Sequence, residues 1–308
     1  MLDALQVILI LLFAPFLQGF IHQVKARLQG RRGASPWQPY REYRKLLGKD
    51  RLLSTSASPI TRVAPVFIVG LLIAGCATLP ALTSSAPLLA GGSFFVFLSL
   101  LAFARFATLM LGLDSGSAFA GMGAGRDLLF GVLTEPIVLL SLIAAGLQRA
   151  AFSFPSLLAV HASSDIWGKL PATLLVLIAL LMVLIVETGR LPIDNPDTHL
   201  ELTMIHEGLT LELTGRDLAL IKWAAAIRQT LWFTLWLDVC LPVGIATTVA
   251  PGPLLVALLL WVGKCLLLGL VVAVLESLSA KMRIFLVPRY LSFALTLAVI
   301  AILADAAL

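Results

Sequence analysis

The chain has 308 residues, of which 59% are hydrophobic and 13% are charged, and its mean hydropathy is +1.00. Soluble domains carry roughly 25% charged residues, so this composition excludes an ordinary soluble protein and indicates an integral membrane protein. The formal net charge of +5 does not indicate nucleic-acid binding, because ten of the 22 Lys and Arg residues lie between Lys25 and Arg62, where they favour membrane orientation and contact with anionic lipid.

Eight segments are long and apolar enough to cross a bilayer as helices, each of which needs about 20 residues. They are predicted at 2–21, 61–80, 94–113, 128–147, 170–188, 224–246, 253–275 and 286–306. The first has no basic flank and no small-residue cleavage site, so we expect a retained helix rather than a cleaved signal peptide. Because spanning segments must satisfy their backbone internally, the sequence predicts an all-α integral membrane protein with residues 1–308 in one polytopic domain.

Basic residues are distributed unevenly between the connecting loops. Loop 22–60 holds nine Lys and Arg residues, whereas loops 81–93 and 247–252 hold none. Because basic loops remain in the cytoplasm, we expect loops 22–60 and 189–223 on the cytoplasmic side and both termini outside.

Loop 22–60 contains a further helix signal. Trp37, Tyr40, Tyr43 and Leu47 recur at helical spacing, with basic residues on the other faces. This pattern predicts a short amphipathic helix in the membrane interface. It is either a membrane anchor or a wall of a chamber used by a docked partner.

The loop between the fifth and sixth spans concentrates acidic residues. Its carboxylates are Glu187, Asp194, Asp197, Glu201, Glu207, Glu212 and Asp217. Asn195 and Pro196 predict a helix start that places Asp197 and Glu201 on one face. Carboxylates stacked in a partly dry site repel one another, so some of their pKa values rise and they can exchange protons. This favours a proton relay, with an ordinary solvated loop as the alternative and as the preferred interpretation for Asp217.

Charged residues inside the predicted spans are also functional candidates. Glu135 lies within the fourth span, beside Pro136, which removes a backbone donor. Asp238, Lys264 and Glu276 define a second candidate, an intramembrane polar path. A Lys264–Asp238 pair that only stabilises helix packing is the alternative.

No metal site or catalytic constellation is predicted. His206 and Glu207 begin an HExxH pattern, but Thr210 stands where the second histidine ligand should be. The cysteines Cys76 and Cys240, like the third at position 265, form no CxxC or Cys/His group, so any electrons must travel through a partner.

Four stretches of the chain resemble one known family. They are KARLQGRRG with PYREYRKLLG, LDSGSAFAGMGAGRDLLFGVLTEPIVLL, ETGRLPIDNPDTHLEL, and EGLTLELTGRDLALIKW. Together they are similar to the membrane subunit shared by respiratory complex I (its subunit 1) and the energy-converting nickel–iron hydrogenases, including formate hydrogenlyase and hydrogenase-4. The LDSGSAF, GAGRD, LTEP and IKW pieces are of the hydrogenase type. The family's usual E-Y-S-G reads Glu212-Leu213-Thr214-Gly215 here, and His199 stands where a carboxylate is common.

The resemblance implies a helical subunit of the bacterial or archaeal inner membrane, lying beneath a hydrophilic redox arm. The implied partners are a cluster-bearing small subunit, a nickel–iron large subunit, antiporter-like membrane subunits and membrane lipid. Iron–sulfur clusters and a nickel–iron centre would belong to those partners, this chain would bind no cofactor, and a quinone stays open. By position, the relay would comprise Glu135, Glu187, Asp194, Asp197, Glu201, Glu207 and Glu212. Arg31, Arg32 and Arg126 match basic positions that face the arm.

Three other functions remain compatible with the residues. The first is a quinone-binding subunit, with the amphipathic helix and the first span lining a tunnel. The second is a standalone cation/proton transporter, although no internal repeat of the kind seen in many transporters is evident. The third is a scaffold that anchors the arm and moves no ion.

Overall fold

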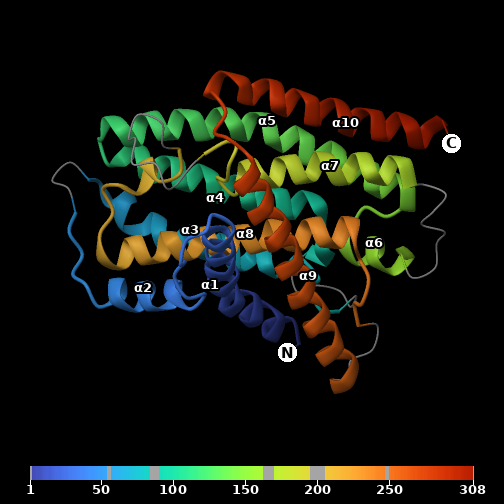
Figure 1. Ribbon diagram of the computed structural model, residues 1–308, viewed down its shortest axis with the longest axis horizontal. Coiled ribbons are helices and arrows are strands. Elements are labelled where there is room, and N and C mark those ends of the chain that lie inside the picture. Colours follow the sequence, from blue (N-terminus) through green and yellow to red (C-terminus); the bar gives the residue numbers. More distant parts are fainter. Residues whose placement is uncertain are drawn as a thin grey trace.

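The computed structural model of the chain describes residues 2–53, 57–83, 90–161, 170–194, 205–246 and 250–307. These residues form ten α-helices with short 3₁₀ turns, and they contain no strand beyond isolated bridges (Figure 1). The helices are α1 (Leu2–Leu28), α2 (Gln38–Leu47), α3 (Pro59–Cys76), α4 (Phe94–Asp114), α5 (Ala118–Arg149), α6 (Phe154–His161), α7 (Leu170–Glu187), α8 (Gly215–Cys240), α9 (Pro251–Leu278) and α10 (Val287–Ala307).

The helices confirm an all-α membrane protein. Among the described residues, six helices are long and apolar enough to cross a membrane, and these are α1, α3, α4, α5, α9 and α10. Helix α7 is apolar but shorter, and α8 is interrupted by charged residues such as Arg228 and Asp238. Each of the eight predicted segments coincides with a helix, whereas the crossing of the bilayer by all eight stays a prediction.

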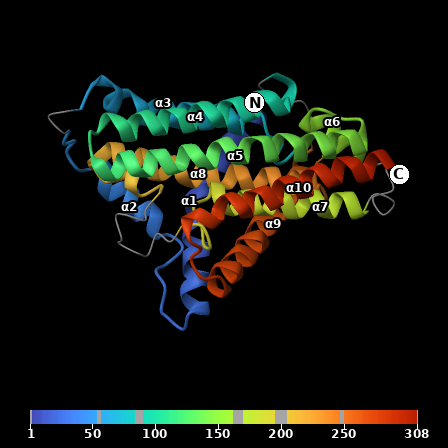
Figure 2. The same ribbon diagram turned by 90° about the horizontal axis from the view of Figure 1, so that it is seen from above.

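Helix α8 forms the centre of the bundle. Every residue from 229 to 239 is buried, because α1, α2, α3 and α7 all pack against this helix. Helix α4 packs between α3 and α5, and α10 covers α5 and α7 (Figure 2). Helix α9 runs obliquely to these helices and packs against α1 (Figure 1). A helix surrounded in this way can hold polar groups away from lipid, so α8 is suited to form one wall of a site.

Helix α2 has the predicted amphipathic character. It begins after Trp37, has Pro39 in its first turn and buries none of its residues completely. The hydroxyl oxygen of Tyr43 lies 3.2 Å from both the side-chain oxygen of Gln18 and the carbonyl oxygen of Lys222, and its single proton can be donated to either. These contacts hold α2 against α1 and α8 at the end of the bundle opposite the C-terminus (Figure 1).

The helices and their boundaries differ from the prediction in several places; α1, for example, extends to Leu28 and α8 begins at Gly215. Helix α5 begins at Ala118, ten residues before the predicted start, because the glycine-rich stretch AGMGAG continues the helix instead of forming a loop. Helix α8 ends at Cys240 rather than 246, since Pro242 disfavours helix at the residue before it. Helix α6, in the loop after α5, was not predicted.

Candidate functional site

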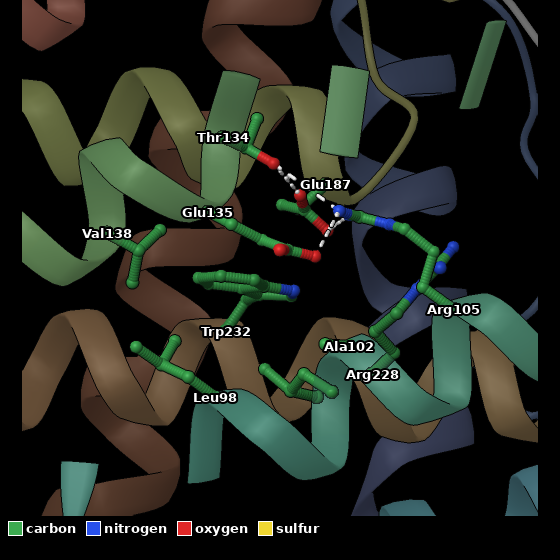
Figure 3. A pocket seen from close by; sticks show the side chains of 10 residues that line it. Leu98, Ala102, Arg105, Thr134, Glu135, Val138, Glu187, Arg228 and Trp232 are labelled. Carbon is green, nitrogen blue, oxygen red and sulfur yellow. Dashed lines mark hydrogen bonds and ion pairs between the residues drawn. The ribbon is translucent and has the colours of Figure 1, made fainter. Parts of the chain in front are cut away.

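Arg105, midway along α4, lies among carboxylates from two neighbouring helices (Figure 3). Its guanidinium forms an ion pair with Glu187 at the end of α7. Its Nη1 lies 3.6 Å from Oε1 of Glu135, and its Nε lies 3.9 Å from Oδ2 of Asp127, both on α5. Gly131 makes room for it, since a Cβ there would lie 2.4 Å from Arg105 Nη1. We call Arg105, Asp127, Glu135 and Glu187 the Arg105 cluster.

The Glu187 carboxylate is the most enclosed acid of this cluster. Its side chain is 3% exposed, and the Thr134 hydroxyl donates to Oε1 at 2.6 Å while Arg105 contacts Oε2. A buried charge is tolerated only when it is paired and hydrogen-bonded, and both conditions hold here. Burial and pairing therefore make Glu187 sensitive to any change in the charge around it.

A pocket opens beside the Arg105 cluster, between α4, α5, α7 and α8 (Figure 3). It has an empty volume of about 360 Å³, including space open to the outside. Leu98, Val138 and Trp232 form an apolar wall, and Arg228 adds a second guanidinium from α8. The Glu135 side chain is 53% exposed, so one acid of the cluster reaches the outside of this subunit while Glu187 stays buried.

His206 extends the cluster into the loop that connects α7 and α8. Its Nε2 lies 3.4 Å from Oδ1 of Asp127, and its Nδ1 lies 4.0 Å from Oδ2 of Asp194. Asp194 accepts a hydrogen bond from the Ile205 backbone at 3.3 Å and pairs with Lys281 at 3.8 Å. A line of ionisable side chains therefore runs from Glu135, through the Arg105 cluster and His206, to Asp194.

A second buried cluster lies at the C-terminal end of α9, the end that is predicted to face the cytoplasm. Arg190 Nη1 lies 3.3 Å from Oε1 of Glu276, and its Nη2 donates to Gln229 at 2.9 Å. Lys25 Nζ lies 3.8 Å from Oε2 of Glu276. All four side chains are buried, so this cluster joins α1, α8, α9 and the residues after α7 through charge.

The predicted relay residues fall into three groups. Glu135, Glu187 and Asp194 lie in the line of ionisable groups described above. Glu207 and Glu212 are exposed and lie outside the buried clusters. The remaining two, at positions 197 and 201, lie outside the described residues, as does the helix predicted to begin after Asn195.

The remaining predicted site residues lie outside the Arg105 cluster, and those of the predicted polar path lie apart from one another. Arg31 and Arg32 are exposed after α1, and Arg126 is half-buried on α5. Lys264 donates to the carbonyls of residues 241 and 243, at 3.2 and 2.8 Å, while Asp238 on α8 is buried. Glu276 lies 12 residues beyond Lys264 on α9, which is about 18 Å along the helix. Asp238, Lys264 and Glu276 therefore do not meet at one point.

Sequence reasoning did not assign Asp127, His206 or Arg190 to a site. Asp127 falls in a segment predicted as a loop, and the sequence shows His206 only as half of an incomplete zinc motif. Arg105 is recognisable in the sequence as a charge inside a span, but its partners are distant along the chain. Among the described residues, no group of three or more His, Cys, Asp or Glu side chains is arranged to hold a metal ion.

The chain matches known proteins over nearly its whole length. The family model described as NADH dehydrogenase matches residues 2–306, a range that includes both buried clusters. Hydrogenase-4 component C of Escherichia coli (strain K12) is 30% identical over 296 residues, covering 96% of this chain and 92% of that protein. Formate hydrogenlyase subunit 4 of the same organism is 31% identical over 285 residues, covering 92% of each.

A solved structure has the same fold. One chain of the membrane-bound sulfane sulfur reductase, an archaeal respiratory membrane complex, aligns with a TM-score of 0.85. The alignment covers 99% of this chain and 100% of that chain, at 21% sequence identity. At this identity the likeness concerns the fold.

Proposed function

Because this chain belongs to the NADH dehydrogenase family, and is a membrane subunit of a complex I-like, hydrogenase-type respiratory complex, we propose that it couples electron transfer to ion movement. The coupled ion is a proton or a sodium ion. The chain anchors the redox arm and carries no redox centre of its own. It spans the bacterial or archaeal inner membrane eight times, with both termini outside.

The single observation that supports this proposal is the Arg105 cluster. One guanidinium faces Asp127, Glu135 and Glu187. A change in the charge of one acid therefore alters the attraction between the guanidinium and the other two acids. Such interactions are stronger away from water, where the effective dielectric constant is low. Electron transfer in a docked arm would change the local field and shift protons between these carboxylates.

The proposed relay follows the acidic side chains. It includes Glu135, Glu187, Asp194, Asp197, Glu201, Glu207 and Glu212. The buried members would hold protons inside the membrane subunit, and the exposed Glu207 and Glu212 would exchange them near the arm. The half-exposed Glu135 would pass them towards an antiporter-like neighbour.

The docking of the arm is assigned to basic side chains. Arg31 and Arg32 are exposed after α1, and Arg126 lies on the first turns of α5. These side chains would contact the cluster-bearing small subunit and the nickel–iron-type large subunit. Iron–sulfur clusters and the nickel–iron centre would be held by those partners.

A second candidate function is quinone binding. Aromatic rings follow one another from Trp261 on α9 through Phe13 and Phe16 on α1 to Trp37 beside α2, with neighbouring centroids 5.1–5.9 Å apart. Such an apolar surface would suit an isoprenoid tail. This candidate predicts quinone-dependent activity that tunnel-blocking compounds inhibit.

The first experiment is to purify the complex from native membranes in mild detergent and to identify its subunits by mass spectrometry. A nickel–iron large subunit, a cluster-bearing small subunit and antiporter-like proteins would support the proposal. The same preparation in liposomes should move protons or sodium ions during electron transfer, and Glu187→Gln should uncouple the two. Recovery of the chain alone with ion flux would favour a standalone transporter, and unchanged ion movement in Glu187→Gln would contradict the relay.

A further inference from the structure

His206 occupies the position between two acids that otherwise belong to different elements. Asp127 is part of α5, and Asp194 follows α7. The two ring nitrogens of His206 face one acid each, with Nε2 3.4 Å from Asp127 and Nδ1 4.0 Å from Asp194. Within the described part of the chain, His206 Nδ1 and Asp127 Oδ2 are buried atoms without a hydrogen-bond partner. A buried imidazole nitrogen without a hydrogen-bond partner, beside an acid oxygen in the same condition, is poorly explained by packing alone.

Two glycines leave room for the ring and its loop in this position. Gly189 has a φ of +61°, and a Cβ there would lie 2.8 Å from His206 Nδ1. A Cβ on Gly123 would lie 2.8 Å from the Ile205 carbonyl oxygen, so only glycine lets the loop lie this close to α5. The placement of His206 therefore depends on residues from α5 and from the turn after α7, as a positioned functional side chain requires.

Burial and the surrounding charges together set the pKa of the ring. Asp127 faces it from α5, Glu187 from α7, Arg228 from α8 and Asp194 from the loop. Burial lowers the pKa of His206 below its ordinary value of 6.5, Arg228 lowers it further, and the three acids oppose this shift. A neutral imidazole has one nitrogen that accepts a proton and one that carries a proton, so it can receive at one edge and release at the other.

We propose that His206 transfers protons between Asp127 and Asp194 and so connects the Arg105 cluster to the α7–α8 loop. The inference rests on the proposed function, because it adds a residue to the relay. The acidic relay passes protons between carboxylates only. This inference instead requires a histidine between Asp127 on α5 and Asp194 after α7. Lys281, 3.8 Å from Asp194, lies at the far side of this step.

The step balances as follows. The protonated carboxyl of Asp127 gives its proton to Nε2 of a ring whose Nδ1 already carries one, which leaves Asp127 ionised and His206 as imidazolium. The imidazolium then releases the Nδ1 proton to the Asp194 carboxylate, and His206 remains as the Nε2–H tautomer. The 4.0 Å gap to Asp194 is bridged by a closer approach of the side chain or by one water molecule. A ring flip or a tautomer exchange returns His206 to its starting state.

The test uses the purified complex in liposomes, with electron transfer and proton movement measured together. In His206→Gln, proton movement should fall by at least about tenfold while electron transfer continues, because glutamine cannot accept a proton. His206→Ala should behave alike and recover proton movement when free imidazole is added, which a merely structural role would not permit. The matched control is His22→Gln, an exposed histidine on α1, which should move protons as the unaltered complex does.

The outcomes separate this inference from the proposed function. If His206→Gln moves protons normally while Glu187→Gln does not, the relay stands and the role of His206 is wrong. If both move protons normally, the relay itself is wrong. Lost movement in His206→Ala that imidazole does not restore also overturns the inference. Should neither His206 variant assemble, infrared difference spectra of the unaltered complex labelled with ring-¹⁵N histidine must show a tautomer change on reduction, and its absence would overturn the inference.

Discussion

Arg190, three residues after α7, forms a buried ion pair with Glu276 on α9, with Nη1 and Oε1 3.3 Å apart although Glu276 comes 86 positions later in the chain. The pair is 8% and 2% exposed, and Lys25 and Gln229 complete its contacts. Removing one partner of a buried pair leaves the other charge without compensation, which is more costly than the pair itself is favourable.

The first prediction concerns this pair. Glu276→Gln should destabilise the folded subunit by about 3–5 kcal/mol, because Arg190 and Lys25 then keep their charges in a buried site. Thermal unfolding of the purified complex in detergent measures the loss. The control is Glu42→Gln, which breaks the half-exposed pair with Lys222 and should cost at most about 1 kcal/mol. Equal melting temperatures for both variants would contradict the prediction.

The second prediction concerns Gly123 on α5. A Cβ there would lie 2.8 Å from the backbone oxygen of Ile205, so Gly123→Ala should push the loop off the helix and make it accessible to proteases. Gly121→Ala and Gly125→Ala are matched controls, since nothing lies within 4 Å of a Cβ at either position. In a helix interior, alanine is favoured over glycine by roughly 0.5–1 kcal/mol, so both controls should melt at or above the temperature of the unaltered protein. A protected loop in Gly123→Ala would show that the backbone can adjust.

The third prediction concerns pH. The folded protein lowers the pKa of His206 below 6.5, mainly through burial, so the ring stays neutral where an unfolded chain would bind a proton. The stability that this contributes is fully present above pH 6.5 and is lost as pH falls from 6.5 towards the lowered value. Hydrogen exchange of the backbone amides of residues 205–213, corrected for its intrinsic pH dependence, should therefore lose protection over that range. His206→Gln should remove this pH dependence. If the amides of that variant lose protection over the same pH range, the titrating group is not His206.

The fourth prediction concerns the shape of the charge at position 105. Arg105→Lys keeps one positive charge, but an ammonium on a flexible stem lacks the planar fork that faces Asp127, Glu135 and Glu187 together. Proton movement in liposomes should fall by at least about tenfold, as expected when a group in a proton path is misplaced. Electron transfer and subunit composition should remain. Normal coupling in Arg105→Lys would mean that only the sign of the charge matters.

Local patterns in the sequence predicted most of the fold. Apolar length placed every long helix, and the spacing of Trp37, Tyr40 and Tyr43 predicted α2, because both signals depend on residues close together in the chain. The start of α5 was misplaced because glycine lowers helix propensity. In the fold, Gly123 is retained in the helix since the loop at Ile205 packs directly on it, a contact that no local pattern reveals.

The candidate site was predicted less completely than the fold. Glu135 and Glu187 stand out as acids inside or at the end of apolar segments. Their common partner Arg105 could not be assigned, since α4, α5 and α7 meet only through tertiary packing. The sequence shows His206 only as half of an incomplete zinc motif, whereas its contact with Asp127 joins positions 79 residues apart in the chain.

The length of α5 has a mechanical consequence. Its 32 residues extend about 48 Å, whereas the hydrocarbon of a bilayer is about 30 Å thick. Even at a tilt of about 40°, roughly 7 Å of the helix stands beyond the hydrocarbon. The loop at Ile205 rests on Gly123 near the start of α5, and Asp127 lies about one turn further along the helix. A push on this end of α5 would therefore reach Asp127 and the buried charges through continuous helix, with no flexible linker between them.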